Sequence, residues 1–371
     1  MSWNKKIYVA TASLGVYYTS NFSDPSVQPT WTAVNTGLGA TTCREFWLDP
    51  FDPENRQYVL IGVTGGLYAR INQGNWNTIL TVAEAAVLLV AAGYTATETG
   101  IFSFCVDSTV AGRLWCFVGS TGIVTHFPRG YFALYSDDYG ANWTVTVAYS
   151  SFNNYGEGYI RAQGDNVFLN GSAQAGGSLR VWYSTNKGTN WTMSAALDFN
   201  TVTNMTFNNL LPNQVYLTID VTGNNYLTSY TNGGVITNPQ TNFSIPRLDS
   251  MWFSLTDANH QRMVKNSALY VTTDEWGTKS DSGAIAPEPY SIAPQVGLDE
   301  DSIFVGLTLG THVIGCLTSE ADTTATGIAG TNAGSAPYTD SIPNTCGGLA
   351  SMGIQSILNV GTINAYGVVM E

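Results

Sequence analysis

Short runs of aromatic and β-branched residues alternate with clusters of Gly, Asn, Asp and Ser along the whole chain. Runs such as 131–135 and 179–183 have turn-forming residues on both sides. Their composition predicts β-strands joined by hairpins rather than long helices. We therefore expect an all-β protein.

Two of these hairpins carry the same eight-residue turn, at 136–143 and 184–191, with the frame Ser-x-Asp/Asn-x-Gly-x-Asn-Trp. The hydroxyl and the Asp or Asn side chain can bond N–H groups of the turn, and Gly can adopt a positive φ. We expect the Trp to return over its own turn and bury its indole. The frame thus predicts structural roles for Ser136, Asp138, Gly140, Trp143, Ser184, Asn186, Gly188 and Trp191.

Weaker copies of this turn set a period along the chain. Ser229 and Gly233 belong to one copy, and Thr273 and Gly277 belong to another. The glycines at 140, 188, 233 and 277 are 48, 45 and 44 residues apart, a spacing typical of β-propeller blades. Degenerate copies at 17–31, 66–76 and 319–322 bring the number of units to seven.

The eight-residue frame resembles the Asp-box, or BNR repeat, of sialidases, sortilin-type receptors and xyloglucan-hydrolysing propellers. Together with the period, it predicts one β-propeller domain over residues 1–371, with seven blades of four-stranded antiparallel sheets. Six or eight blades are the alternatives. Strand character returns at 354–360 and 362–369, and we expect this segment to pair in the blade of residues 6–10 and so close the ring.

Two segments interrupt the repeat. Residues 79–99 form an insertion whose Ala, Leu and Val content permits one short helix. Residues 318–350 are rich in Thr, Ala, Gly, Ser and Asn and predict a long loop.

The charge balance argues against a nucleic-acid partner. The net charge is −13, with only 14 Lys and Arg residues and no basic cluster of any size. The most apolar run, 82–92, is about half of the roughly 20 residues that a membrane-spanning helix needs. No secretory signal is recognisable, so either the signal was removed and Met1 replaced it, or the protein leaves its cell by another route. We expect an extracellular or virion-associated protein without membrane insertion.

The five cysteines form no CxxC pair and no metal-ligand spacing with the three histidines, so no metal or cofactor is expected. Cys105 and Cys116 lie on flanking strand-like runs, and Cys316 and Cys346 bracket the polar loop. Each pair is a candidate disulfide, with buried thiols as the alternative.

No catalytic constellation is evident in the sequence. The family resemblance implies an Arg triad and a Tyr nucleophile for a sialidase, but the nearest match to its signature, 243–247, has the wrong order. Glycoside hydrolysis needs two carboxylates across a cleft. The candidates are Asp107, Glu157, Asp165, Asp220 and Asp249, each with a turn or surface role as the alternative. Asp49 and Asp52 are expected to form a turn between two strands.

The aromatic residues offer a candidate binding surface. Tyr155 and Tyr159 lie in a loop-like segment and could stack on sugar rings, with a core role as the alternative. We expect a non-catalytic binding or structural propeller of an extracellular assembly, such as a phage virion or appendage, that recognises glycan or protein. The alternatives are a glycoside hydrolase or sialidase-like enzyme acting on surface polysaccharide, and a sortilin-like peptide-binding propeller. The expected partners are other assembly proteins, surface glycan or further copies of the chain.

Overall fold

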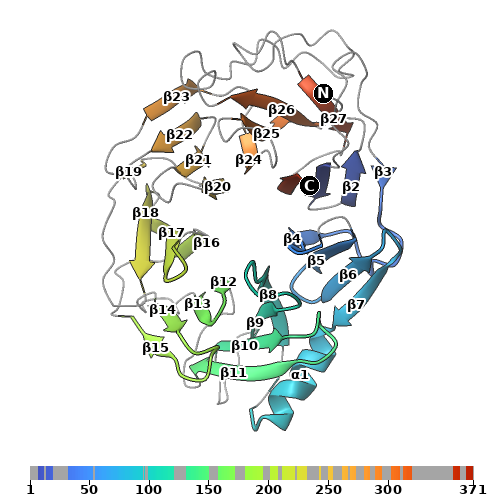
Figure 1. The fold of residues 1–371 in the computed structure, drawn as a ribbon, viewed down its shortest axis with the longest axis vertical. Coiled ribbons are helices and arrows are strands. Elements are labelled where there is room, and N and C mark those ends of the chain that lie inside the picture. Colours follow the sequence, from blue (N-terminus) through green and yellow to red (C-terminus); the bar gives the residue numbers. More distant parts are fainter. Residues whose placement is uncertain are drawn as a thin grey trace. The chain divides into compact units, whose positions relative to one another are not determined.

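The structure is a computed structural model. It describes residues 7–11, 14–19, 32–52, 55–94, 96, 99–120, 131–149, 158–171, 180–194, 201–207, 211–221, 224–231, 242–243, 250–253, 261–265, 268–272, 280–284, 289–294, 302–309, 312–319, 354–359 and 365–370. These residues form four-stranded antiparallel sheets and one short helix, so the all-β prediction is confirmed (Figure 1).

The chain divides into two compact units. Unit 1 comprises Met1–Thr36, Thr41–Phe46 and Arg247–Glu371, and unit 2 comprises Gly37–Ala40 and Trp47–Pro246. That the whole chain forms one domain stays a prediction.

Unit 1 contains three sheets. The first has the order β28-β1-β2-β3, from β1 (Ile7–Thr11), β2 (Gly15–Thr19), β3 (Thr32–Ala33) and β28 (Ala365–Met370). The second runs in chain order through β20 (Ser250–Phe253), β21 (Gln261–Lys265), β22 (Ala268–Thr272) and β23 (Ser280–Ala284). The third does the same through β24 (Pro289–Pro294), β25 (Ser302–Leu309), β26 (His312–Ser319) and β27 (Ile354–Asn359).

The last strand of the chain pairs with the first. β28 and β1 form an antiparallel ladder from Ile7 opposite Met370 to Thr11 opposite Ala365, as expected for the C-terminal segment. The preceding strand β27 instead pairs with β26, so the two C-terminal strands belong to different sheets. The number of blades and the closure of a ring stay predictions.

Unit 2 contains four sheets, although the first four residues of β4, 43–46, belong to unit 1. Each runs in chain order: β4 (Cys43–Leu48), β5 (Arg56–Ile61), β6 (Leu67–Ile71) and β7 (Trp76–Leu80); β8 (Thr99–Val106), β9 (Leu114–Ser120), β10 (Tyr131–Ser136) and β11 (Thr144–Tyr149); β12 (Ile160–Gln163), β13 (Asn166–Gly171), β14 (Arg180–Ser184) and β15 (Thr192–Met193); β16 (Thr201–Phe207), β17 (Gln214–Val221), β18 (Asn224–Thr231) and β19 (Asn242–Phe243).

The helix α1 (Val82–Ala91) occupies the predicted insertion. Thr81 caps its N-terminus, and Glu84 completes a capping box by accepting the Thr81 backbone N–H. Ala85 and Leu89 are buried on its inner face. The short helix expected within 79–99 is therefore confirmed. The predicted 318–350 loop lies almost entirely outside the described residues.

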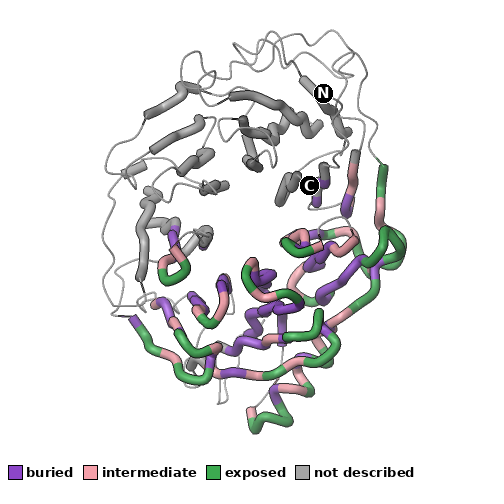
Figure 2. The backbone as a smooth tube through the Cα atoms, in the orientation of Figure 1, coloured by how far each residue is buried: buried purple, intermediate pink, exposed green. Residues whose placement is uncertain are grey.

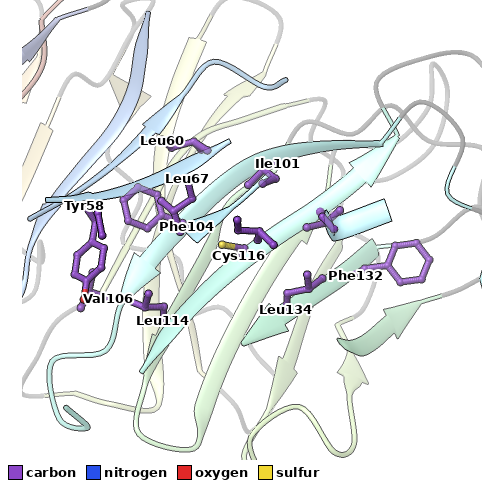
Figure 3. Packing of buried hydrophobic residues seen from close by; sticks show 14 of the residues in the cluster. Tyr58, Leu60, Leu67, Ile101, Phe104, Val106, Leu114, Cys116, Phe132 and Leu134 are labelled. Carbon is purple, nitrogen blue, oxygen red and sulfur yellow. The ribbon is translucent and has the colours of Figure 1, made fainter. Parts of the chain in front are cut away.

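The sheet β8–β11 is buried on both faces. One face, with Phe104, Cys116 and Leu134, packs against residues of β5, β6 and α1 (Figure 3). The other face, with Trp115 and Phe117, packs against residues of β12, β13 and β14. Every residue of β8 is buried (Figure 2). Because strand side chains alternate between faces, adjacent residues of β8 such as Phe104 and Cys105 belong to two different cores.

This alternation explains why the predicted Cys105–Cys116 disulfide is not formed. Cys105 lies opposite Trp115 and Cys116 lies opposite Phe104, so the two thiols point to opposite faces of the sheet. Both are buried thiols, as is Cys43. Cys346 lies outside the described residues, so the Cys316–Cys346 disulfide stays a prediction.

Candidate functional site

The first copy of the eight-residue turn is closed by its own side chains. Ser136 Oγ donates to Asp138 Oδ1 over 2.7 Å and accepts from the backbone N–H of Gly140 over 2.8 Å. Asp138 in turn accepts from the Asn142 backbone N–H at 2.8 Å and from Asn142 Nδ2 at 2.6 Å. These hydrogen bonds lower the pKa of the exposed Asp138 carboxyl to about 2, and the bond from the Asn142 side chain has the largest effect.

The second copy repeats this arrangement with an amide in place of the carboxylate. Ser184 Oγ donates to Asn186 Oδ1 and accepts from the Gly188 N–H, both over 2.9 Å. Asn186 Oδ1 accepts from the backbone N–H of Asn190 at 2.9 Å. Both turns therefore use side-chain oxygens to satisfy their own backbone, and their oxygens serve structure.

The tryptophans of the two turns bind the preceding sheet. Trp143 Nε1 donates to the Ile79 carbonyl on β7 over 3.0 Å, and Trp191 Nε1 donates to Thr146 Oγ1 on β11 over 2.9 Å. The Thr146 hydroxyl donates to the carbonyl of Gly188. Each half-buried ring thus joins its turn to the neighbouring sheet, and the covering of the turn by its own indole stays a prediction.

The residue before each glycine makes a second contact with a neighbouring element. Tyr139 and Lys187 both have positive φ, 62° and 55°. The Tyr139 ring lies 3.9 Å from Arg56 Cζ at the start of β5. Lys187 Nζ lies 4.3 Å from the Tyr135 ring centroid and donates to Asp137 Oδ2 in the turn of the preceding sheet.

Asp137 is the centre of a charged group on these turns. It also accepts from Arg113 Nε over 2.7 Å, and Arg113 Nη1 reaches the Gly164 carbonyl at 2.9 Å and Asp165 Oδ1 at 3.3 Å. Burial alone would raise the pKa of Asp137, but the hydrogen bonds and charges of Lys187 and Arg113 hold it below its usual value. The group joins the sheets β8–β11 and β12–β15.

The weaker copies of the turn are only partly described. Ser229 lies near the end of β18, opposite Tyr216, and its role in a turn stays a prediction. Gly233, Thr273 and Gly277 lie outside the described residues. In the degenerate copy at 66–76, Ala69 stands at the position of the serine, and the next residue, Arg70, donates to the carbonyls of Gln73 and Gly74, both over 3.0 Å.

Two of the candidate carboxylates, Asp107 and Asp165, have local structural partners. Asp107 is fully buried, and its Oδ1 accepts from the backbone N–H groups of Thr109 and Val110 and from the Thr109 hydroxyl. Asp165 is largely exposed and pairs with Arg113. Asp220 lies on β17 opposite Thr201 and Asn225. Glu157 and Asp249 lie outside the described residues.

Asp49 and Asp52 lie in the turn between β4 and β5, where the sequence predicts turn-forming roles. The buried Asp49 accepts from the Phe51 N–H over 2.9 Å and from the Tyr58 hydroxyl over 3.4 Å. Burial, and then the Asp49 charge, raise the pKa of Tyr58. Asp52 Oδ1 accepts from Asn55 Nδ2 at 3.0 Å.

Polar and aromatic side chains from the first strands of three sheets meet at Arg161. Its Nη1 donates to the Ile160 carbonyl over 2.7 Å and to Ser103 Oγ on β8 over 3.1 Å. Its Cζ lies 5.5 Å from the ring centroid of Trp47 on β4 and 5.7 Å from that of Tyr159. We call Trp47, Ser103, Tyr159 and Arg161 the first-strand cluster.

The backbone before β12 fixes the position of Tyr159. Its N–H donates to Asn170 Oδ1 over 3.0 Å, and its carbonyl accepts from the Asn170 N–H over 3.1 Å. Gly158 lies so close to the Asn170 carbonyl that a Cβ there would approach it to 2.1 Å. Tyr159 therefore has a defined position at the end of its strand.

The first-strand cluster combines groups that suit a sugar or a polar peptide. Trp47 and Tyr159 are half-buried rings that could stack on a ligand, and the guanidinium of Arg161 and the hydroxyl of Ser103, which are both buried, lie beside them. Sequence reasoning found Tyr159 but missed Trp47, Ser103 and Arg161; the second predicted tyrosine, Tyr155, lies outside the described residues. An arginine inside a strand of a chain with only 14 Lys and Arg residues was the available signal.

The described residues contain no group of three or more His, Cys, Asp or Glu side chains arranged to hold a metal ion. Within the same part of the chain, no helix is both long and apolar enough to cross a bilayer.

Similar proteins were found through structure alone: no family model matches the chain, and no curated protein matches it in sequence. The structure of a GH74 enzyme from Niastella koreensis has a TM-score of 0.57 and 15% identity, over 85% of this chain and 51% of the enzyme. A GH74 xyloglucanase from Xanthomonas campestris has a TM-score of 0.55 and 13% identity, over 83% of this chain and 49% of that enzyme. A functionally unknown protein from Desulfotomaculum acetoxidans has a TM-score of 0.53 and 10% identity, over 98% of both chains.

These likenesses decide the fold class. The two GH74 enzymes are β-propellers, and this chain has the β-propeller fold. At such low identity the likeness extends to the fold alone. The chain also spans about half the length of the two GH74 enzymes.

Proposed function

We propose that this protein is a non-catalytic binding or structural propeller of an extracellular assembly, such as a phage virion or appendage, and that it recognises glycan or protein. The observation that carries the proposal is the first-strand cluster, where the Arg161 Cζ lies 5.5 Å from the ring centroid of Trp47 and 5.7 Å from that of Tyr159. Aromatic faces beside hydrogen-bonding groups are what a sugar ring requires.

The described carboxylates support binding over hydrolysis. Asp49, Asp107 and Asp138 each accept backbone N–H groups of their own turns, and Asp137 and Asp165 pair with Arg113. A general acid needs a raised pKa, whereas the hydrogen bonds of Asp138 lower its pKa to about 2.

We also infer that the turns at 136–143 and 184–191 are Asp-boxes of the BNR type. Their shared hydrogen bonds, from Ser136 to Gly140 and from Ser184 to Gly188, support this assignment. In this account the turns build the scaffold, and the first strands bear the binding surface.

Glycoside hydrolysis of surface polysaccharide is the second candidate, because two of the similar structures are GH74 enzymes. Its carboxylates would come from Glu157, Asp220 or Asp249. A glycan array followed by reducing-sugar release on each bound glycan separates the two candidates. Binding without release supports the first. Release that is lost in the Asp220→Asn or Glu157→Gln variant would establish the second.

Membership of a particle is tested separately. Immunogold electron microscopy of the native source, with antibodies to this chain, should label a virion or appendage. Label confined to free protein would contradict the assembly role while leaving the binding role open to the array.

A further inference from the structure

Two polar atoms near the turn of the β8–β9 hairpin are buried without a hydrogen-bond partner. Asp107 Oδ2 and Trp115 Nε1 form no hydrogen bond within the part of the chain that the structure describes. Both residues are fully buried, so bulk water does not reach them. Since nearly all buried polar groups in native proteins bond to protein or to internal water, each of these two atoms requires a partner.

The β8–β9 ladder places both side chains on the same face of the sheet. The Asp107 N–H donates to the Arg113 carbonyl over 3.0 Å, which extends the β8–β9 register by one residue. Trp115 lies opposite Cys105, and side chains two residues apart on a strand share a face. Asp107 and Trp115 are therefore diagonal neighbours, with Cβ atoms about 7 Å apart. A carboxyl and an indole can span this separation with one small molecule between their polar atoms.

The two atoms have complementary requirements. Trp115 Nε1 can only donate a hydrogen bond, and the carboxylate oxygen Asp107 Oδ2 accepts one. The Asp107 carboxylate is held in place, because its Oδ1 accepts from the backbone N–H groups of Thr109 and Val110 over 2.8 and 3.1 Å. We propose that one internal water molecule binds between Trp115 and Asp107, where it accepts from Nε1 and donates to Oδ2.

The charges beside this site favour a neutral occupant. Arg113 lies opposite Asp107 in the ladder, and its side chain is buried. A metal cation would meet the indole N–H and the neighbouring guanidinium charge, whereas an anion would meet the Asp107 carboxylate. Water is a small neutral molecule that both donates and accepts, and two polar partners are enough to hold it in a protein interior.

A direct bond between the two atoms would disturb contacts that their side chains already make. The Trp115 ring packs against that of Tyr135, with centroids 5.0 Å apart, and belongs to the core shared with β12–β14. The Thr109 hydroxyl adds a third bond to Asp107 Oδ1, over 2.7 Å. A bridging water leaves both side chains in their observed positions.

The proposed water lies beside the joint between the sheets β8–β11 and β12–β15. Arg113 stands between Asp107 and Trp115 in the chain, and its Nη1 donates to the Gly164 carbonyl over 2.9 Å. A water bound to both Asp107 and Trp115 connects the β8–β9 turn to the core and so helps to hold Arg113 against the neighbouring sheet. This role does not depend on the ligand of the first-strand cluster.

A high-resolution crystal structure of the full chain tests the proposal directly. It should show one ordered water molecule within about 2.7–3.2 Å of both Trp115 Nε1 and Asp107 Oδ2. A direct bond between the two atoms, or a protein group bonded to either of them, would overturn the proposal. A metal ion at this position, or no ordered molecule there, would overturn it as well.

NMR of the protein labelled with ¹⁵N-tryptophan measures the same contact in solution. The Trp115 indole proton should show a nuclear Overhauser peak at the water frequency, with the sign of a long-lived bound molecule, and Trp115→Phe should remove that signal. Trp143, whose Nε1 donates to the Ile79 carbonyl, is the control and should show no such peak. A wild-type Trp115 proton without the peak would contradict the proposal.

The Asp107→Asn variant distinguishes a bridging water from a direct bond. Because Oδ1 still accepts from Thr109 and Val110, the amide nitrogen replaces Oδ2 and becomes a donor. A water molecule can turn and accept from both donors, whereas the amide and the indole cannot bond to each other. The Trp115 peak should therefore persist in Asp107→Asn and disappear in Asp107→Leu. Loss of the peak in a folded Asp107→Asn protein would show that the water is not held in this way.

Discussion

At the scale of single residues, Gly140 and Gly188 are required for two reasons. Their φ values, 89° and 71°, lie in the left-handed region that disfavours a Cβ. Each also touches the preceding sheet, since a Cβ on Gly140 would lie 2.8 Å from Ile79, and one on Gly188 would lie 2.8 Å from Thr146. The repeated turn therefore requires glycine for both its backbone and its docking.

We expect Gly140→Ala to lower the free energy of unfolding by about 2–4 kcal/mol, through backbone strain and overpacking against Ile79. Gly164→Ala is the control, because Gly164 also has positive φ but a Cβ there would come no closer than 3.5 Å to its nearest contact, Thr109 Oγ1. Gly164→Ala should lower the free energy of unfolding only through backbone strain, by about 1–2 kcal/mol. Urea unfolding measures both, and equal losses would show that the contact with Ile79 contributes nothing.

The Asp138 carboxyl should titrate at about pH 2 in the folded protein, against 3.8 for the unperturbed group. Because the carboxyl pKa is lower in the folded than in the unfolded protein, the ionised group stabilises the fold when the pH is above the unfolded-state pKa. This contribution is lost as the pH falls from about 4 to about 2. The thermal midpoint of Asp138→Asn should therefore approach that of wild type over this interval. An NMR titration should give the carboxyl pKa directly; a value near 3.8 would contradict the hydrogen bonds described.

At the scale of elements, each turn is a joint between two sheets. Trp191 and Thr146 show this most clearly, because the indole donates to the Thr146 hydroxyl and that hydroxyl donates to the Gly188 carbonyl. The turn at 184–191 is thereby tied to the outer strand β11 of the preceding sheet. Lys187 adds an ionic contact to Asp137 beside this joint.

We expect Thr146→Val and Trp191→Phe each to cost about 1–3 kcal/mol, since each leaves a polar partner without its hydrogen bond. The double variant should cost less than the sum by at least about 0.5 kcal/mol, because both changes break one shared contact. Thr144→Val, at an exposed position of the same strand, should be close to neutral. Additive losses in urea unfolding would mean that the turn and the strand are not coupled.

The sequence predicted the strands, the helix and the hydrogen-bonding residues of the turns, because these depend on residues close together in the chain. It did not predict what the indoles of Trp143 and Trp191 bind, since Ile79 and Thr146 carry no local signal. The first-strand cluster was missed for the same reason. Trp47 and Arg161 belong to different sheets, and only tertiary packing brings them together.

At the scale of the whole molecule, the cores of unit 2 are shared between successive sheets. The sheet β8–β11 contributes to two clusters, with Phe104 and Leu134 in one and Trp115 in the other. In unit 1, the ladder between β1 and β28 joins the two ends of the chain in one sheet. Long-range pairing of this kind makes the stability of the fold depend on its last residues.

Removal of residues 361–371 deletes β28 and leaves the edge of β1 without its partner strand. We expect a lower thermal midpoint and concentration-dependent aggregation, because an open edge can pair with other chains. Substitution of only Glu371, beyond the end of the strand, is the control. A truncated chain as stable and soluble as the full protein would show that the β1–β28 ladder is dispensable.

The first-strand cluster is the basis of the proposed function, and isothermal titration with the best-binding oligosaccharide from the array tests it most directly. Trp47→Ala and Tyr159→Ala should each weaken binding at least about tenfold, or about 1.4 kcal/mol. Phe51→Ala, at an aromatic residue that is 49% exposed in the β4–β5 turn, should bind as wild type does. Folded Trp47→Ala and Tyr159→Ala variants with wild-type affinity would contradict the account.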